Sequence, residues 1–305
     1  MHRLFFDLNN WKNRKKGELS CVKMNLLINN GLLHYSMRQY VIVLMMTLVM
    51  FSASLSGCLG GDDDAEEKSE IDLIIYYDTT FGTIQENIQN GNQVSFSGVE
   101  LTFNYAFTKS GAGEITTFYF ESGDGSTRTE VDANETGEIT YNYVTHGLFT
   151  ATLGALDDAG NDEKMTLTIR IDKTTQWSES GTTNPSTMNI DTTPDCECNS
   201  PSQIEIDSVV ENPANQFGLG GGPVTVTWKL TSSEVERESQ PEQLGDGQDA
   251  SWLHNEIGPL PEVWKLDVEL NHNEEQVNIE HNVSIKYSAD ESSPNPLPTG
   301  QTPEE

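Results

Sequence analysis

The chain has 305 residues, with 48 acidic and 17 basic side chains and a formal net charge of −31 at neutral pH. This charge argues against a nucleic-acid-binding protein, because contacts to phosphates need clustered lysine and arginine. Four cysteines are too few for a disulfide-rich scaffold. A hydrophobic content of 35% is enough to bury a core, and the length allows about two domains.

The N-terminal segment differs in charge from the rest of the chain. Residues 1–57 hold seven basic and two acidic side chains, so the remaining 46 acids follow them. Tyr40–Phe51 is an uncharged run of 12 residues preceded by Arg38. A bilayer span needs about 20 residues, so this run is typical of a signal peptide. Residues 1–57 are therefore predicted to be a signal peptide region, with the true start at Met37 or Met24.

A short motif follows the apolar run. Leu55, Ser56, Gly57 and Cys58 resemble the lipobox of prokaryotic lipoproteins, those of archaea included. The resemblance implies that Cys58 is lipidated and becomes the new N-terminus, with the protein held at the cell membrane and facing the exterior. Buried acyl chains contribute about 0.8 kcal/mol per CH₂. Residues 58–70 then form an acidic tether. The alternatives are an ordinary secretory signal or an uncleaved helix.

The part of the chain after the predicted signal peptide is expected to form β-strands. Two segments, residues 71–173 and residues 204–287, alternate apolar and polar side chains, and this pattern is typical of antiparallel strands with one buried face. The predicted fold class is all-β, with two Ig-like antiparallel β-sandwiches. Residues 174–203 are predicted to be a flexible linker, and residues 288–305 a disordered tail.

The first of these segments resembles a known domain family. Ile115–Ser126 (ITTFYFESGDGS) and Ile139–Asn161 (ITYNYVTHGLFTATLGALDDAGN) are similar to the two halves of the PKD domain. The resemblance covers roughly residues 90–172, and Glu121-Ser122 departs from the phenylalanine that usually precedes the GDG turn. It implies an Ig-like sandwich of a surface protein, used as a spacer or as an adhesive or carbohydrate-associated unit.

No catalytic motif is present in the sequence. It contains neither an HExxH zinc-protease motif nor a GxSxG nucleophile motif, so the protein is not expected to be an enzyme. One alternative is a surface hydrolase of glycans or peptides, with a carboxylate site around Glu256–Glu262 near Trp252 and Trp264. Another alternative is a structural component of the envelope.

Acidic residues near two predicted turns are the candidate metal ligands. Asp157, Asp158 and Asp162 are clustered, and Asp124 lies in its own loop. Carboxylate oxygens are the ligands that Ca²⁺ prefers. None of these residues fits a regular calcium loop, so simple turn chemistry is the competing interpretation and no other cofactor is expected.

Two kinds of covalent modification are also predicted. Cys196 and Cys198 are separated by one residue, and three states remain open: a local disulfide, an intermolecular crosslink or a soft-metal pair. Asn134 and Asn282 each begin an Asn-x-Ser/Thr sequon for glycosylation. Asn134 is the better candidate, because Asn282 falls within a strand pattern.

The predicted function is therefore binding at the cell surface. We expect a lipid-anchored, non-catalytic protein whose partners are the membrane and surface proteins or polysaccharides, with no nucleic acid. Contact with a partner is expected at the loops around Gly123–Thr127 and Val144–Gly147.

Overall fold

A computed structural model describes residues 70–214, 222–271 and 275–300 of the chain. The described residues form 18 β-strands, which confirms the predicted all-β, sandwich fold class. None of them forms a helix that is long and apolar enough to cross a membrane.

The first module is a β-sandwich over the N-terminal part of the described chain. One layer contains β7, β6 and β9 with the first half of β10, and the facing layer contains the β4–β8 pair. A short β1–β5 pair joins the same core. The strands are β1 (Ile71–Asp72), β4 (Val99–Asn104), β5 (Lys109–Ser110), β6 (Ile115–Glu121), β7 (Thr129–Asp132), β8 (Glu138–Tyr143) and β9 (Gly147–Asp157).

Aromatic side chains fill the core of this module. Phe103 stacks on Phe120, and Tyr143 stacks on Phe149 with their ring centroids 5.0 Å apart. The buried hydroxyl of Tyr143 donates a hydrogen bond to the carbonyl oxygen of Ser122 at 2.8 Å. The strand alternation that is visible in the sequence therefore brings these rings together, and the polar end of Tyr143 is satisfied inside the core.

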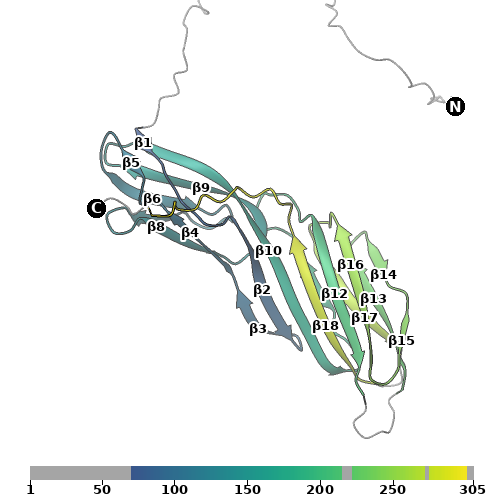
Figure 1. The fold of residues 1–305 in the computed structure, drawn as a ribbon. Coiled ribbons are helices and arrows are strands. Elements are labelled where there is room, and N and C mark those ends of the chain that lie inside the picture. Colours follow the sequence, from purple (N-terminus) through teal and green to yellow (C-terminus); the bar gives the residue numbers. More distant parts are fainter. Residues whose placement is uncertain (1–69, 215–221, 272–274, 301–305) are drawn as a thin grey trace, which may run out of the picture. The chain divides into compact units, whose positions relative to one another are not determined.

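Strand β10 (Asp162–Thr182) is shared by both modules. Its first half pairs antiparallel with β9, and from Lys173 onward it pairs antiparallel with β18. On its other edge, residues 170–178 pair parallel with β2 (Phe81–Gln89). Figure 1 shows β10 running the length of both modules. The two sandwiches are thus joined by one continuous strand.

This strand corrects the predicted linker at residues 174–203. Residues 174–182 belong to β10, and β11 (Met188–Asp191) pairs with β17. The segment looks like a linker in sequence because its inward positions, Thr175, Trp177 and Glu179, include only one large apolar side chain. Ladder hydrogen bonds to strands on both edges of β10, rather than an apolar stripe, hold it extended.

The second module packs two sheets around two adjoining apolar clusters. The first sheet has the order β3–β2–β10–β18–β12–β16, and we call it the six-stranded sheet. The second has the order β11–β17–β13–β14, with β15 also paired to β13. The remaining strands are β3 (Asn92–Ser97), β12 (Gln203–Asn212), β13 (Val224–Thr231), β14 (Glu236–Glu238), β15 (Glu242–Leu244), β16 (Gln248–Ile257), β17 (Val263–Asn271) and β18 (Val277–Lys286).

The C-terminal tail also differs from the prediction. Residues 288–305 were expected to be disordered, but the described part to residue 300 contacts the first module. Glu291 accepts two hydrogen bonds from the Arg170 guanidinium, at 2.8 and 2.9 Å. Asn295 forms a β-bridge with Tyr77. Polar contacts hold this segment, and they leave no hydrophobic pattern in the sequence. The composition therefore did not show that the segment is ordered.

Candidate ligand-binding face

The outer face of the six-stranded sheet, which points away from the second sheet, carries polar side chains in register. Gln176 of β10 lies opposite Asn87 of β2 and Asn282 of β18. Asn282 in turn lies opposite Asp207 of β12. Figure 1 shows these four strands side by side. Because facing residues of paired strands project on the same side of a sheet, the four side chains form a row across it.

A hollow of about 390 Å³ lies along this row. We call it the transverse groove. Trp177 and His281 lie beneath it, because they alternate along their strands with the outward-facing residues and their side chains point into the core. Its described lining also contains eight residues whose side chains face outward: Asn87, Gln89, Gln176, Ser178, Asp207, Val209, Glu280 and Asn282.

The polar side chains of the groove are left without partners. Among the described residues, the seven polar side chains of the outward-facing set make no hydrogen bond or ion pair. Some polar groups on the same face beyond the groove are paired. Thr174 and Ser284 hydrogen bond at 2.9 Å, and Glu205 binds Lys286. The groove therefore combines a hollow with a row of hydrogen-bonding groups that are available to a ligand.

A buried polar cluster supports the sheet beneath the groove. The Trp228 indole donates to the Ser208 hydroxyl at 2.6 Å, and that hydroxyl lies 2.7 Å from His281 Nδ1. Ser208 accepts the indole hydrogen of Trp228 and, with a second lone pair and its own hydrogen, is able to pair with either tautomer of His281. Burial lowers the pKa of His281 to about 4. The cluster fixes β12, β13 and β18 relative to one another.

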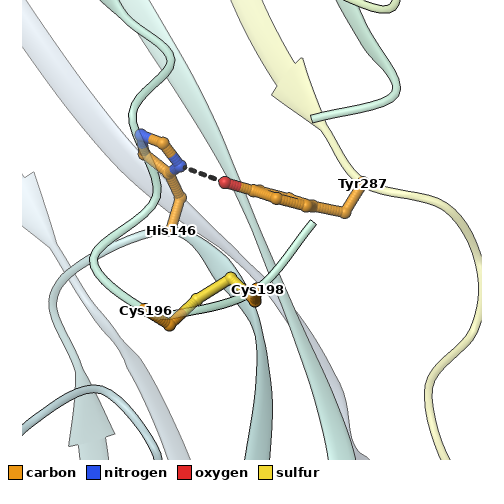
Figure 2. The surroundings of a disulfide bond; sticks show 4 residues. All are labelled: His146, Cys196, Cys198 and Tyr287. Carbon is orange, nitrogen blue, oxygen red and sulfur yellow. Dashed lines mark hydrogen bonds between the residues drawn. A yellow bond between two sulfur atoms is a disulfide. The ribbon is translucent and has the colours of Figure 1, made fainter. Parts of the chain in front are cut away.

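A second histidine lies where the two modules meet. His146 Nδ1 is 2.8 Å from the Tyr287 hydroxyl, and Nε2 is 3.1 Å from the carbonyl oxygen of Asp191. Burial lowers the pKa of His146, so its neutral form is favoured. A disulfide joins Cys196 to Cys198 close by, as Figure 2 shows. Of the three states open from the sequence, the structure has the local bridge.

The four candidate calcium ligands lie at opposite ends of β6. Asp124 follows its C-terminal end, where it accepts hydrogen bonds from the hydroxyls of Ser122 and Tyr141. Burial raises the pKa of Asp124, but the bonds from Ser122 and Tyr141 outweigh it and hold this pKa below its usual value. Asp124 thus stabilises the turn between β6 and β7.

The other three carboxylates are also engaged by protein groups. Hydrogen bonds from Asn161 and Ser110 lower the pKa of Asp157 to about 2. Asp158 accepts from the backbone N–H of Glu114 at 3.0 Å, and Asp162 accepts from a tyrosine hydroxyl at 2.8 Å. Among the described residues, no three or more acidic, histidine or cysteine side chains are grouped as a metal site.

The carboxylates of the hydrolase alternative are likewise bound by neighbours. Glu256 is buried and accepts two hydrogen bonds from Arg237, each 2.9 Å long. Burial raises the pKa of Glu256, but Arg237 and His254 outweigh it, so this pKa is lowered. Trp264 is buried and donates its indole hydrogen to a backbone carbonyl, while Trp252 stacks on His254.

The remaining predicted sites are placed as follows. Asn134 is exposed in the turn after β7, and Asn282 is exposed within β18 and lines the transverse groove. The predicted contact loops, Gly123–Thr127 and Val144–Gly147, do not line the groove. The lipobox residues Leu55, Ser56 and Gly57 and the lipidation site Cys58 lie outside the described residues.

Reasoning from the sequence did not find the groove. Its side chains come from segments near residues 87, 176, 207 and 282, and only the strand register brings them together. One signal was present: polar residues alternate with apolar ones in β12 and β18, which indicates a solvent-facing side. The sequence does not show which strands are neighbours, so it could not identify the row.

A comparison with known families matches most of the first module, together with residues 85–89 of β2 and all of β3. Residues 85–172 match the sequence profile of the PKD domain family, so the chain contains a PKD-like domain and the resemblance is confirmed. The match ends within β10, near the residue where this strand begins to pair with β18. No curated protein matches the chain.

Three solved structures are distantly similar. One is described as a carbohydrate-binding module of the β-sandwich superfamily, with 11% identity and a TM-score of 0.27, covering 72% of this chain and 97% of that one. Tripeptidyl peptidase 2 has 8% identity, a TM-score of 0.21 and coverage of 71% and 20%. The secreted serine protease VesC from Vibrio cholerae has 10% identity, a TM-score of 0.16 and coverage of 68% and 50%. TM-scores this low say nothing about the ligand of this chain.

Proposed function

We propose that this chain is a lipid-anchored protein of the outer cell surface that binds a protein or a polysaccharide without catalysis. The observation that carries the proposal is the transverse groove, whose polar side chains have no partner among the described residues. The sheet fixes the backbone positions of these unpaired amides and carboxylates, so a ligand has to order only their side chains.

The continuous strand β10 adds to this proposal. Because it contributes to both modules, it joins the first module to the groove through one continuous strand. The first module then acts as a rigid spacer for the groove. This role agrees with the spacer use that the PKD resemblance implies.

The hydrolase alternative has less support. A general acid needs a pKa raised toward the working pH. Glu256 has the opposite shift, and its two oxygens are bound by Arg237. We therefore assign a structural role, and no catalytic role, to the Glu256–Arg237 ion pair.

Retention on envelopes tests the binding role. The full chain with Cys58→Ala, which lacks the lipid site, is mixed with envelopes of the producing organism and sedimented. We expect it to be retained, and Gln176→Arg, which fills the groove, to weaken retention about tenfold, equivalent to about 1.4 kcal/mol. Asn189→Arg is the matched control, because Asn189 is exposed on β11 of the other sheet. Equal retention of both variants, or no retention of the parent chain, would overturn the proposal.

Detergent partitioning tests the anchor separately. The wild-type chain made in the producing organism is expected in the detergent phase, and Cys58→Ala in the aqueous phase. A lipid chain adds about 0.8 kcal/mol per buried CH₂, so its loss changes the partition strongly. If both forms partition equally, the chain is not anchored through Cys58.

A further inference from the structure

We infer that the ligand of the transverse groove is an uncharged polysaccharide, lying across β2, β10, β18 and β12. The inference rests on the proposed function, because it names the ligand class for the same groove. It follows from three features of the lining: the kind of polar group, the lack of apolar anchors and the charge.

The polar groups match hydroxyls better than any other ligand group. Four of the seven unpaired polar side chains are amides, from Asn87, Gln89, Gln176 and Asn282. An amide donates and accepts hydrogen bonds at once, and so does a sugar hydroxyl. The carboxylates of Asp207 and Glu280 accept only, and a hydroxyl supplies the donor that they need.

The spacing of these groups favours an extended chain of sugars. Asn87, Gln176, Asn282 and Asp207 stand on adjacent strands in register. Neighbouring strands are about 4.8 Å apart, which is close to the length of one sugar unit in an extended glycan. Successive units are therefore able to meet successive side chains of the row.

The lining does not resemble the centre of a protein interface. Such centres are rich in Tyr, Trp, Phe, Met and Arg and contain buried anchors. Val209 is the one apolar side chain that faces outward among the described residues of the lining. The Trp177 side chain belongs to the apolar cluster on the opposite side of the sheet, so it gives the outer face no anchor.

Charge separates uncharged from acidic polysaccharides. The described lining includes Asp207 and Glu280 and has no lysine or arginine. The nearest basic residue on this face, Lys286, is bound to Glu205. With a net charge of −31 on the chain, an acidic polymer would be repelled.

The experiment uses the same envelope assay with treated envelopes. Periodate oxidation cleaves the vicinal diols of sugars, whereas protease digestion removes proteins. We expect periodate to lower retention of the Cys58→Ala chain about tenfold and protease to leave it unchanged. We also expect retention to be constant between about 0.05 and about 0.5 M salt, because uncharged ligands are not screened.

Groove variants complete the test. Gln176→Ala removes one amide and leaves no bulky group, and its expected loss of retention is about fivefold. The matched control, Asn189→Ala, is expected to bind like the parent.

The outcomes separate this inference from the proposed function. If Gln176→Arg abolishes retention but protease rather than periodate destroys the ligand, the groove binds a protein and the polysaccharide inference falls alone. Retention that rises or falls with salt identifies a charged ligand and also overturns it. If Gln176→Arg has no effect, the proposed function fails as well.

Discussion

The two modules use their exposed polar side chains differently. In the PKD-like module, the acidic side chains near the turns are held by hydroxyls, amides and backbone N–H groups, as Asp124 and Asp157 show. On the outer face of the six-stranded sheet, the groove side chains contact no partner among the described residues. Polar groups that are already paired stabilise a fold, whereas unpaired ones on a rigid surface remain available for recognition.

The largest expected effect concerns whether the modules are independent. Phe149 is buried in the first module and stacks on Tyr143, so Phe149→Ala is expected to destabilise the protein by about 4 kcal/mol. The tryptophans of the described residues, 177, 228, 252 and 264, all lie in the second module. Because β10 is shared, we expect the tryptophan fluorescence transition in urea to shift together with the circular dichroism transition.

The contrary result would show that the two modules are independent folding units. A fluorescence midpoint that stays at the wild-type urea concentration, while circular dichroism shows a new early transition, would mean that the modules unfold separately. The conservative variant Phe149→Leu is a second test. It is expected to lower the unfolding free energy less than Phe149→Ala, so the protein stays folded at neutral pH before urea is added.

The next effect is the pH dependence of the second module. His281 has a folded pKa of about 4, and its unfolded pKa is near 6.5, so the unfolded state binds the proton more tightly. Stability from this group is complete above pH 6.5 and is lost as the pH falls toward 4, by about 3 kcal/mol in total. His146, whose pKa is also lowered by burial, acts in the same direction.

Nuclear magnetic resonance provides the direct measurement for His281. The imidazole resonance of the wild-type protein is expected to titrate near pH 4, well below that of an exposed histidine. The unfolding free energy of His281→Gln is expected to fall less than that of the wild type between pH 7 and pH 5. A histidine that titrates near 6.5 would contradict the buried Ser208–His281 pair.

The strands of both modules could be predicted from the sequence. Val224, Val226, Trp228 and Leu230 alternate with polar residues, and in the structure all four are buried in β13. The same logic failed for residues 174–182, because this part of β10 has only Trp177 as a large apolar side chain facing inward. The alternation of apolar and polar residues indicates which side chains are buried. It therefore identifies a strand only where the buried side chains are apolar.

The candidate site could not be predicted for a different reason. Asn87 and Gln176 are paired through a parallel ladder, and Asn282 joins them from a third strand. Such long-range register depends on the packing of the whole sheet. The contact between Glu291 and Arg170 has the same character, because an isolated acidic residue near a terminus gives no hint of its partner.

A smaller effect is expected at the turn that Asp124 stabilises. Asp124→Ala removes the acceptor for Ser122, Tyr141 and the backbone N–H of Ser126, so a loss of about 1–2 kcal/mol is expected in urea unfolding. If the carboxylate serves the turn alone, millimolar Ca²⁺ will not raise the thermal midpoint of the wild type. A calcium-dependent rise that Asp124→Ala abolishes would instead make it a metal ligand.

The smallest effect on stability is expected in the groove. Gln176 is exposed and its side chain has no hydrogen-bond partner among the described residues, so Gln176→Ala should change the unfolding free energy by no more than about 0.5 kcal/mol. Thr174→Ala on the same strand and face is the matched comparison, because it removes the hydrogen bond to Ser284 and should cost about 1 kcal/mol. A larger loss for Gln176→Ala than for Thr174→Ala would mean that the amide supports the sheet. The row of unpaired side chains would then be part of the fold, and the difference between the two modules would disappear.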